Sequence, residues 1–252
     1  MIPKKTAKLI KSLHHKKYRK KYGLFLVEGA KSVQEILLST FSIETLFSTK
    51  DFLNQHINLI EDKLKDDKIM QVKEQELAVV GTLQTNNAAL ALVSIRENAP
   101  LVVNNEYALA LDDIRDPGNL GTILRIADWY GIRKMICSPE TAELYNPKVI
   151  SASMGSFLRV QVYYTDLATY FQQNYAPVYG AVLDGENVHQ MHFPGKGIIL
   201  LGNESHGIHQ NLLPFLQKKI HIPRYGGAES LNVAIATAVI CDNIRRFNDP
   251  QP

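Results

Sequence analysis

Apolar and polar residues alternate along the second half of the chain in a way that predicts strands and helices in turn. Short apolar runs predict strands at 109–114, 134–138, 158–164, 178–183, 198–202 and 219–222. Apolar residues at intervals of three and four predict helices at 119–130, 147–154, 166–174, 209–217 and 230–246. Such alternation is typical of a parallel sheet with helices on both faces. An α/β fold is therefore expected here, and the pattern alone favours an ordinary doubly wound sheet.

The first hundred residues predict a second, smaller α/β unit. An apolar run at 24–29 indicates a strand, and 30–38 has one apolar helical face. Further short strands are expected at 43–48, 69–72 and 89–95, followed by a linker, Glu97-Asn98-Ala99-Pro100. A unit of this size can fold alone. We therefore predict two domains, residues 1–98 and 105–248.

Composition fits this picture and excludes several classes of protein. The chain has 252 residues, of which 45% are hydrophobic and 21% charged, as in globular proteins. Its apolar runs are much shorter than a membrane span, and no signal-peptide pattern opens the sequence. Cys137 and Cys241 both lie in apolar surroundings. They predict reduced core thiols and a cytoplasmic protein.

Positive charge is concentrated at the N-terminus. Nine Lys and Arg residues lie between Lys4 and Lys21, with no acidic residue before Glu28. Tyr18 and Tyr22 are interleaved with them, and together they suit phosphate contacts and base stacking. A disordered basic tail is the alternative interpretation. The residues expected to contact nucleic acid are Lys16, Lys17, Arg19, Lys20 and Lys21.

Candidate chemistry lies in three segments, each placed where a predicted strand ends. The first, Asp-Asp-Ile-Arg-Asp-Pro-Gly-Asn-Leu-Gly at 112–121, is a turn that leads into a helix, which Asn119 can cap. Arg125 falls opposite the apolar stripe of that helix, one turn from Trp129. An arginine there is often merely solvated. Its position near a glycine-rich strand-to-helix turn also suits a functional role.

The other two segments have the same character. Gly202-Asn203-Glu204-Ser205-His206-Gly207-Ile208 follows a buried strand, and its glycine permits close approach of a ligand to the backbone. The segment 222–234, Ile-Pro-Arg-Tyr-Gly-Gly-Ala-Glu-Ser-Leu-Asn-Val-Ala, places Ser230 and Asn232 where a helix begins. A capped helix after a flexible turn would explain the last segment alone. Three such segments in one chain favour a binding site.

In order and spacing, the three segments resemble the motifs of the SpoU (TrmH-like) family of RNA ribose 2′-O-methyltransferases, in the SPOUT superfamily. The resemblance covers residues 105–247 and implies a trefoil-knotted parallel sheet. Residues 17–38, including Tyr-Arg-Lys-Lys-Tyr-Gly-Leu-Phe-Leu-Val-Glu-Gly, resemble the family's N-terminal substrate-binding domain, which is similar to RNA-binding domains of the ribosomal-protein type. No dinucleotide-binding or P-loop glycine motif is present in the sequence.

The resemblance also implies a site and a reaction. The cofactor would be S-adenosylmethionine, lined by Gly202, Ile222 and Leu231 together with Leu183 and Leu201. Asn119, Glu204, Ser230 and Asn232 match family positions near the donor and the acceptor ribose, and Arg125 matches the arginine assigned to catalysis. Because a guanidinium is always protonated, we expect Arg125 to clamp a phosphate or to stabilise the developing alkoxide rather than to act as a base.

Substrate and assembly are less defined by the sequence. The separate N-terminal domain favours ribosomal RNA over transfer RNA, by analogy with the family. The helix at 230–246 is apolar nearly all round, which suits either a central helix in a monomer or a buried dimer contact. Family members dimerise through this helix and the helix of the first motif. We therefore predict a homodimer, in which Arg125 can serve the partner's site.

Two other interpretations stay open from the sequence. The chain can be a non-catalytic RNA-binding scaffold, or a small-molecule enzyme with an unrelated basic tail. The pairs His189/His192 and His206/His209 have the spacing of zinc ligands. Since no cysteine or acidic ligand set accompanies them in the sequence, no metal site is expected.

Overall fold

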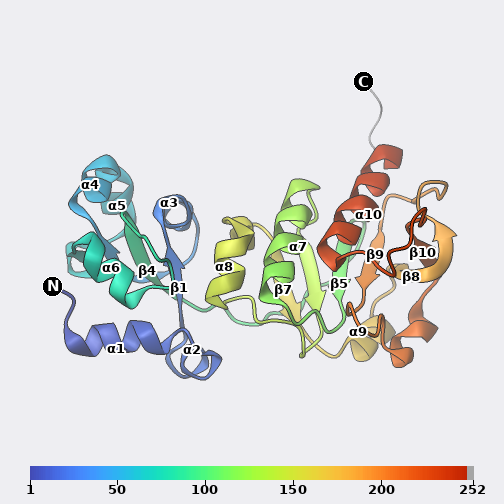
Figure 1. The fold of residues 1–252 in the computed structure, drawn as a ribbon, viewed down its shortest axis with the longest axis horizontal. Coiled ribbons are helices and arrows are strands. Elements are labelled where there is room, and N and C mark those ends of the chain that lie inside the picture. The colour runs from blue at the N-terminus through green and yellow to red at the C-terminus, as the bar shows by residue number, and fades with distance from the viewer. Residues whose placement is uncertain (249–252) are drawn as a thin grey trace. The chain divides into compact units, whose positions relative to one another are not determined.

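The structure is a computed structural model, which describes residues 1–248 (Figure 1). The chain forms two compact units. One comprises residues 1–97 and 143–158, and the other comprises 98–142 and the residues from Arg159 onward. The break after Glu97 falls within the expected linker. Residues 143–158, in contrast, lie in the sequence of the expected second domain but pack with the first unit.

The first unit is a four-stranded sheet surrounded by short helices. Its strands are β1 (Leu24–Glu28), β2 (Ile43–Ser48), β3 (Ile69–Gln71) and β4 (Ala89–Ser94), in the order β1-β4-β2-β3. Only the β2–β3 pair is parallel within this sheet. The helices are α1 (Lys4–Ser12), α2 (Lys16–Tyr22), α3 (Ala30–Leu38), α4 (Lys50–Gln55), α5 (Ile57–Lys63), α6 (Glu74–Val80) and α8 (Pro147–Ser153), with 3₁₀ turns η1 (Asp66–Lys68) and η2 (Ser156–Leu158).

Aromatic packing explains why 143–158 belongs to this unit. The ring of Phe25, on β1, contacts Tyr145 at 4.5 Å between centroids and Phe157 at 6.0 Å. Phe41 completes the cluster, 6.0 Å from both phenylalanine rings. Each buried aromatic ring removes a large apolar area from water. The segment 143–158 therefore packs where its rings are buried, although its neighbours in the sequence belong to the second unit.

The second unit is the expected parallel sheet. Its strands are β5 (Tyr107–Leu111), β6 (Lys134–Cys137), β7 (Gln161–Tyr164), β8 (Val178–Asn187), β9 (Gly197–Leu201) and β10 (Lys218–His221), in the order β10-β8-β9-β5-β6-β7. All pairs in it are parallel. The helices are α7 (Pro117–Trp129), α9 (Leu167–Gln173) and α10 (Val233–Asn248), with the 3₁₀ segment η3 (Gln210–Phe215). The predicted α/β fold with a parallel sheet is confirmed.

Two predicted helices differ from the structure for local reasons. The segment expected as a helix at 209–217 is a 3₁₀ segment that contains Pro214, and proline removes the N–H that a longer α-helix needs. The C-terminal helix begins at Val233 rather than at residue 230, because Asn232 stands at its N-terminus as the cap. Ser230 and Leu231 are consequently in the loop before it.

Both faces of the second sheet are covered. Ala108 and Ala110 of β5 belong to a core with Tyr170 and Phe171 of α9 and Leu212 of η3. The intervening side chains of β5 point to the opposite face, where Figure 1 shows α7 and α10. The trefoil knot is not tested by strand order and pairing and stays a prediction. In residues 1–248, no helix is both long enough and apolar enough to cross a membrane.

Candidate active site

Helix α7 is capped by a residue other than Asn119, so the Asn119 side chain can take part in the site. Sequence reasoning assigned the helix cap to Asn119, but the cap is Asp116, whose carboxylate accepts a hydrogen bond from the Asn119 backbone N–H at 2.8 Å. Pro117 occupies the first turn, where its missing N–H costs nothing. The amide side chain of Asn119 is therefore not consumed by capping.

Residues from all three sequence motifs meet at this point. The Asn119 side-chain amide donates to Oε1 of Glu204. Asn232 Nδ2 donates to Asn119 Oδ1 at 3.0 Å and lies 3.3 Å from Glu204 Oε1. Asn232 Oδ1 in turn accepts from the backbone N–H of Ala234 at 3.0 Å, which ties the cluster to the start of α10. Three of the five side chains predicted to be catalytic thus form one hydrogen-bonded cluster, which we call the motif cluster.

A cavity of about 710 Å³ lies beside the motif cluster, and we call it the donor cavity. Three segments line most of it, at 181–184 in β8, at 201–208 and at 219–231, including Glu204 and Ser230. Its walls carry all five residues predicted to bind the cofactor: Leu183, Leu201, Gly202, Ile222 and Leu231. The structure therefore brings that predicted set together around one space.

The residues of the donor cavity fit S-adenosylmethionine. Its volume is within the range of small-molecule sites. Leu183 is 81% exposed and Leu231 is 49% exposed, so two apolar side chains stand uncovered at a cavity wall. A Cβ on Gly202 would lie 2.3–2.5 Å from the backbone of Gly207 and Ile208, so only glycine allows this loop to fold back as it does. Apolar side chains beside loop backbone suit a flat adenine with polar edges.

A second cavity, of about 390 Å³, also borders the motif cluster, and we call it the polar cavity. It is lined by Asp113, Ile114, Arg115, Asp116, Asn119, Asn203, Glu204, Ser205 and His206. Asn119 and Glu204 line it, and Glu204 also lines the donor cavity, so the motif cluster borders both spaces. Such a pair of spaces suits two reactants that must meet.

The carboxylate of Asp113 is a charged group that sequence reasoning missed. It accepts from Arg115 Nε at 2.6 Å and contacts His206 Nε2 at 3.0 Å. Burial by itself would raise the pKa of Asp113, but the hydrogen bonds from Arg115 and His206 outweigh it and lower that pKa. The adjacent Asp112 contacts His209 Nδ1 at 2.9 Å. In the sequence, two features could have indicated these contacts: the acidic residues at the end of a predicted strand and the His-x-x-His spacing of His206 and His209.

Arg125 lies apart from the motif cluster. It is exposed on α7 and lines neither cavity. Within the described residues, its guanidinium forms no hydrogen bond or ion pair. It is separated by one helical turn from Trp129, whose side chain is 85% exposed. The side chain is therefore available to a molecule that approaches from solvent.

The predicted RNA-binding residues separate into two groups. Lys16, Lys17, Lys20 and Lys21 are exposed on α2. Arg19 on the same helix is only 1% exposed. Its guanidinium donates to the carbonyl of Leu13 at 2.8 Å and forms an ion pair with Glu143 at 2.5 Å. The prediction that Arg19 contacts RNA is therefore corrected, because its donors are already used inside the first unit.

The parallel α/β fold and the converging motifs agree with the methyltransferase class that the three motifs resemble. The sequence profile of the SpoU rRNA Methylase family matches residues 106–242, and that of the MRM3-like substrate binding domain matches residues 4–91. The chain therefore belongs to the SpoU rRNA Methylase family. The expected family and enzyme class are confirmed.

Relatives and solved structures agree with this assignment. The chain is 28% identical to the 23S rRNA (guanosine(2553)-2′-O)-methyltransferase RlmP of Bacillus subtilis, over 93% of this chain and 94% of the relative. A putative RNA methyltransferase of the TrmH family from Porphyromonas gingivalis is 34% identical, with a TM-score of 0.87 over 98% of this chain and 99% of that one. The AdoMet-bound rRNA methyltransferase from Sinorhizobium meliloti is 26% identical, with a TM-score of 0.84 over 97% and 95%.

Proposed function

We propose that this chain transfers a methyl group from S-adenosylmethionine to a ribose 2′-hydroxyl of ribosomal RNA. The observation that carries the proposal is the motif cluster: Asn119, Glu204 and Asn232 join three separate segments beside the donor cavity. Family membership supports the reaction. The name of the Bacillus subtilis relative, a 23S rRNA 2′-O-methyltransferase, supports the acceptor.

The motif cluster would orient the acceptor ribose and would not serve only to bind the donor. When bound, S-adenosylmethionine supplies an electrophilic methyl group with its leaving group already attached. Orientation can then provide much of the rate, because aligned reactants avoid the entropic cost of meeting. The two amides hold the Glu204 carboxylate in place, and a fixed carboxylate can accept a hydrogen bond from a ribose hydroxyl. Ser230, at the wall of the donor cavity, offers a further hydroxyl.

Arg125 would act on the RNA. A guanidinium is effectively always charged and pairs strongly with phosphate oxygens. Because Arg125 is exposed on α7, it can clamp the phosphate next to the target nucleotide or stabilise the developing alkoxide. The proton of the hydroxyl then leaves to water or to a phosphate oxygen.

The first unit would hold the RNA through α2. Lys16, Lys17, Lys20 and Lys21 form an exposed positive surface on that helix, and the ring of Tyr18 stacks on Tyr22 at 6.3 Å. Phosphates attract such a surface through release of counterions. Ribosomal RNA is the preferred substrate, and transfer RNA is the alternative within the same reaction.

We further propose a homodimer in the cytoplasm. Helices α7 and α10 pack against each other, yet Trp129 is 85% exposed and Ile235 is 54% exposed on them. Large apolar side chains left exposed on neighbouring helices suit a contact with a second copy. In such a dimer, Arg125 would serve either its own site or that of the partner.

Transfer of a labelled methyl group tests the proposal. The chain is incubated with labelled S-adenosylmethionine and RNA that lacks its own modifications, and the products are digested to locate the label. Label at a ribose 2′-O position of ribosomal RNA, greatly reduced in Arg125→Ala, is the expected result. Label found only in transfer RNA would show that transfer RNA, and not ribosomal RNA, is the substrate. Donor binding without transfer to any RNA, including ribosome assembly intermediates, would favour a non-catalytic scaffold.

A further inference from the structure

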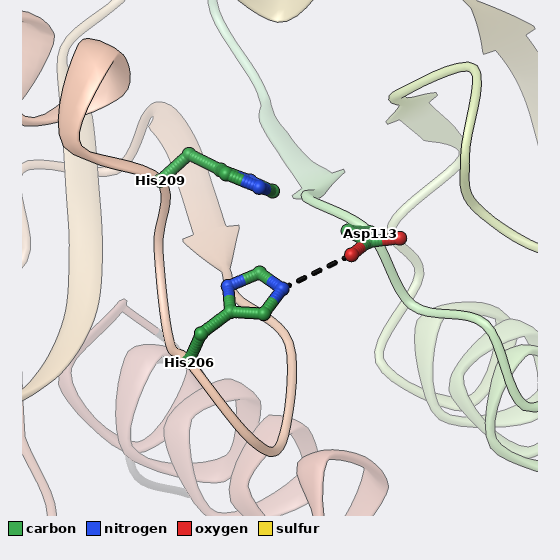
Figure 2. Close-up of side chains that lie close together, drawn as sticks. All are labelled: Asp113, His206 and His209. Carbon is green, nitrogen blue, oxygen red and sulfur yellow. Dashed lines mark hydrogen bonds and ion pairs between the residues drawn. The ribbon is translucent and has the colours of Figure 1, made fainter.

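Two histidines and an aspartate converge at the edge of the polar cavity. Figure 2 shows the rings of His206 and His209 directed toward the carboxylate of Asp113. One possible ligand atom from each of these residues lies within 4.8 Å of the others. His206 and His209 come from the loop after β9, and Asp113 follows β5, the strand paired with β9. The parallel pairing of the two strands therefore brings together side chains that are far apart in the sequence.

We propose that Asp113, His206 and His209 bind a divalent transition-metal ion of the zinc type. Two imidazoles and one carboxylate are ligands that zinc prefers. The proposal goes beyond methyl transfer and holds with or without RNA. It also replaces the expectation of no metal site, since the acidic ligand missing from the sequence around the histidines is supplied by Asp113.

The spacing of the first two ligands suits a shared ion. In a tetrahedral site with metal bonds of about 2.0 Å, neighbouring ligand atoms lie roughly 3.3 Å apart. His206 Nε2 lies 3.0 Å from Asp113 Oδ2. An ion can therefore take the place of the proton that joins these atoms, with only a small outward movement of the exposed imidazole.

The third ligand is oriented by a neighbouring carboxylate. His209 Nδ1 lies 2.9 and 3.0 Å from the two oxygens of Asp112, which also accepts from the His209 backbone N–H at 2.8 Å. Because an ionised carboxylate only accepts, Nδ1 carries a hydrogen, and Nε2 is the nitrogen that an ion can bind. A carboxylate that holds the far nitrogen of a histidine is the usual outer support of a metal ligand.

Asp113 is also held in an unusual position. Its φ is +59°, in the left-handed region that most residues avoid. Its backbone N–H donates to Ser138 Oγ at 3.0 Å, and its carbonyl accepts from Asn203 Nδ2 at 2.7 Å. The carboxylate is 1% exposed in this position. A strained residue with fixed neighbours is typical of sites where a side chain must be aimed.

The charges around the site favour a cation. Asp112 and Asp113 contribute two negative charges, against the one positive charge of Arg115. Arg115 engages Oδ1 of Asp113 at 2.6 Å. Oδ2 faces His206 and has one longer contact, from Asn203 Nδ2 at 3.5 Å, so it can still bind an ion. With three protein ligands, the fourth position stays available for water or an oxyanion. That position would face the polar cavity, which Asp113 and His206 both line.

Metal titration of the full-length protein tests the proposal without donor or RNA. The protein is first stripped with a chelator, and Zn²⁺ binding is followed by calorimetry, with Co²⁺ absorption as a report on geometry. We expect one ion per chain and tetrahedral Co²⁺ bands. A double variant, His206→Ala with His209→Ala, should bind Zn²⁺ more than about 100-fold more weakly, because two of the three ligands are lost. Asp112→Asn keeps all three ligands and should weaken binding by about 10- to 100-fold.

The second histidine pair provides a matched control. His189 and His192 have the same spacing and are exposed, but within the described residues they do not belong to a cluster of three such side chains. The double variant His189→Ala with His192→Ala should bind Zn²⁺ as the parent does. Circular dichroism and the metal-free Tm verify that each variant is folded. Absence of binding by the parent, or equal binding by the His206/His209 variant, would overturn the proposal. Neither result bears on methyl transfer.

Discussion

Asn232 Nδ2 donates a 3.0 Å hydrogen bond to Asn119 Oδ1, although 113 positions separate the two residues. The same Asn232 caps α10 through its Oδ1. One amide therefore fixes the start of a helix with its oxygen and the motif cluster with its nitrogen. This double use makes the position of the cluster depend on the position of α10.

Separate variants can distinguish the two roles of Asn232. In Asn232→Asp the capping oxygen is kept, but the donor is replaced by a charge that repels Glu204. We expect methyl transfer to fall about 100-fold, as when a positioned hydrogen-bond donor is removed from a site, with little change in stability. Asn232→Ala should lower activity similarly and also cost about 1 kcal/mol of stability through the lost cap. Equal stability of Asp and Ala variants in chemical denaturation would contradict the capping role.

Gly202 should tolerate no side chain. Because its Cβ would lie 2.3 Å from the Gly207 carbonyl carbon, Gly202→Ala must displace the loop that carries Glu204. We expect a loss of about 2 kcal/mol in the free energy of unfolding and weaker donor binding. Gly227→Ala is the matched control, since a Cβ there meets no atom within 4 Å. Calorimetric S-adenosylmethionine binding and denaturation curves measure both effects, and similar behaviour of the two variants would be the contrary result.

Arg19 should matter for folding rather than for RNA. Arg19→Met leaves Glu143 and two backbone carbonyls without their buried partner. We expect the free energy of unfolding to fall by about 3 kcal/mol, as when one member of a buried ion pair is removed. Lys20→Met on the exposed side of α2 is the control and should change stability little. Unchanged stability of Arg19→Met would contradict this role.

The exposed lysines of α2 should set the salt dependence of RNA binding. Replacing Lys16, Lys17, Lys20 and Lys21 by Gln removes four potential phosphate contacts. The slope of log affinity against log salt concentration should become shallower by about 3. Filter binding at several salt concentrations measures this slope. An unchanged slope would show that RNA is held by another surface.

His14 should make the first unit less stable in mild acid. Burial lowers its pKa from 6.5, against an opposing effect of Glu28. The unfolded chain then binds a proton more readily than the folded chain, so stability is complete above about pH 6.5 and declines as pH falls from there towards the folded-state pKa. His14→Gln should show a smaller loss of stability than the parent between neutral pH and pH 5, measured by chemical denaturation at several pH values. Identical pH profiles of the two proteins would contradict this assignment.

Much of the fold could be predicted because the information is local. The apolar run before Asp112 predicted β5, and the stripe that includes Leu120 and Ile123 predicted α7. When one face of an element is buried, its apolar residues recur about every two positions in a strand and about every 3.6 positions in a helix. The elements can therefore be recognised without knowledge of what they pack against. Asn119, Glu204 and Asn232 each stand where such an element begins or ends, and their roles were implied by the resemblance of the three segments to the SpoU motifs.

The sequence by itself determined the α/β pattern, the three motifs and the basic N-terminal segment, since each is encoded by residues close together in the chain. Only the tertiary structure decided that Arg19 is buried against Glu143, that 143–158 packs with the first unit, and that Asp113 meets His206 and His209. These relationships depend on which strands pair and which apolar faces cover one another. Such choices are made by burial over the whole molecule, so local patterns can suggest the residues involved but cannot determine which of them meet.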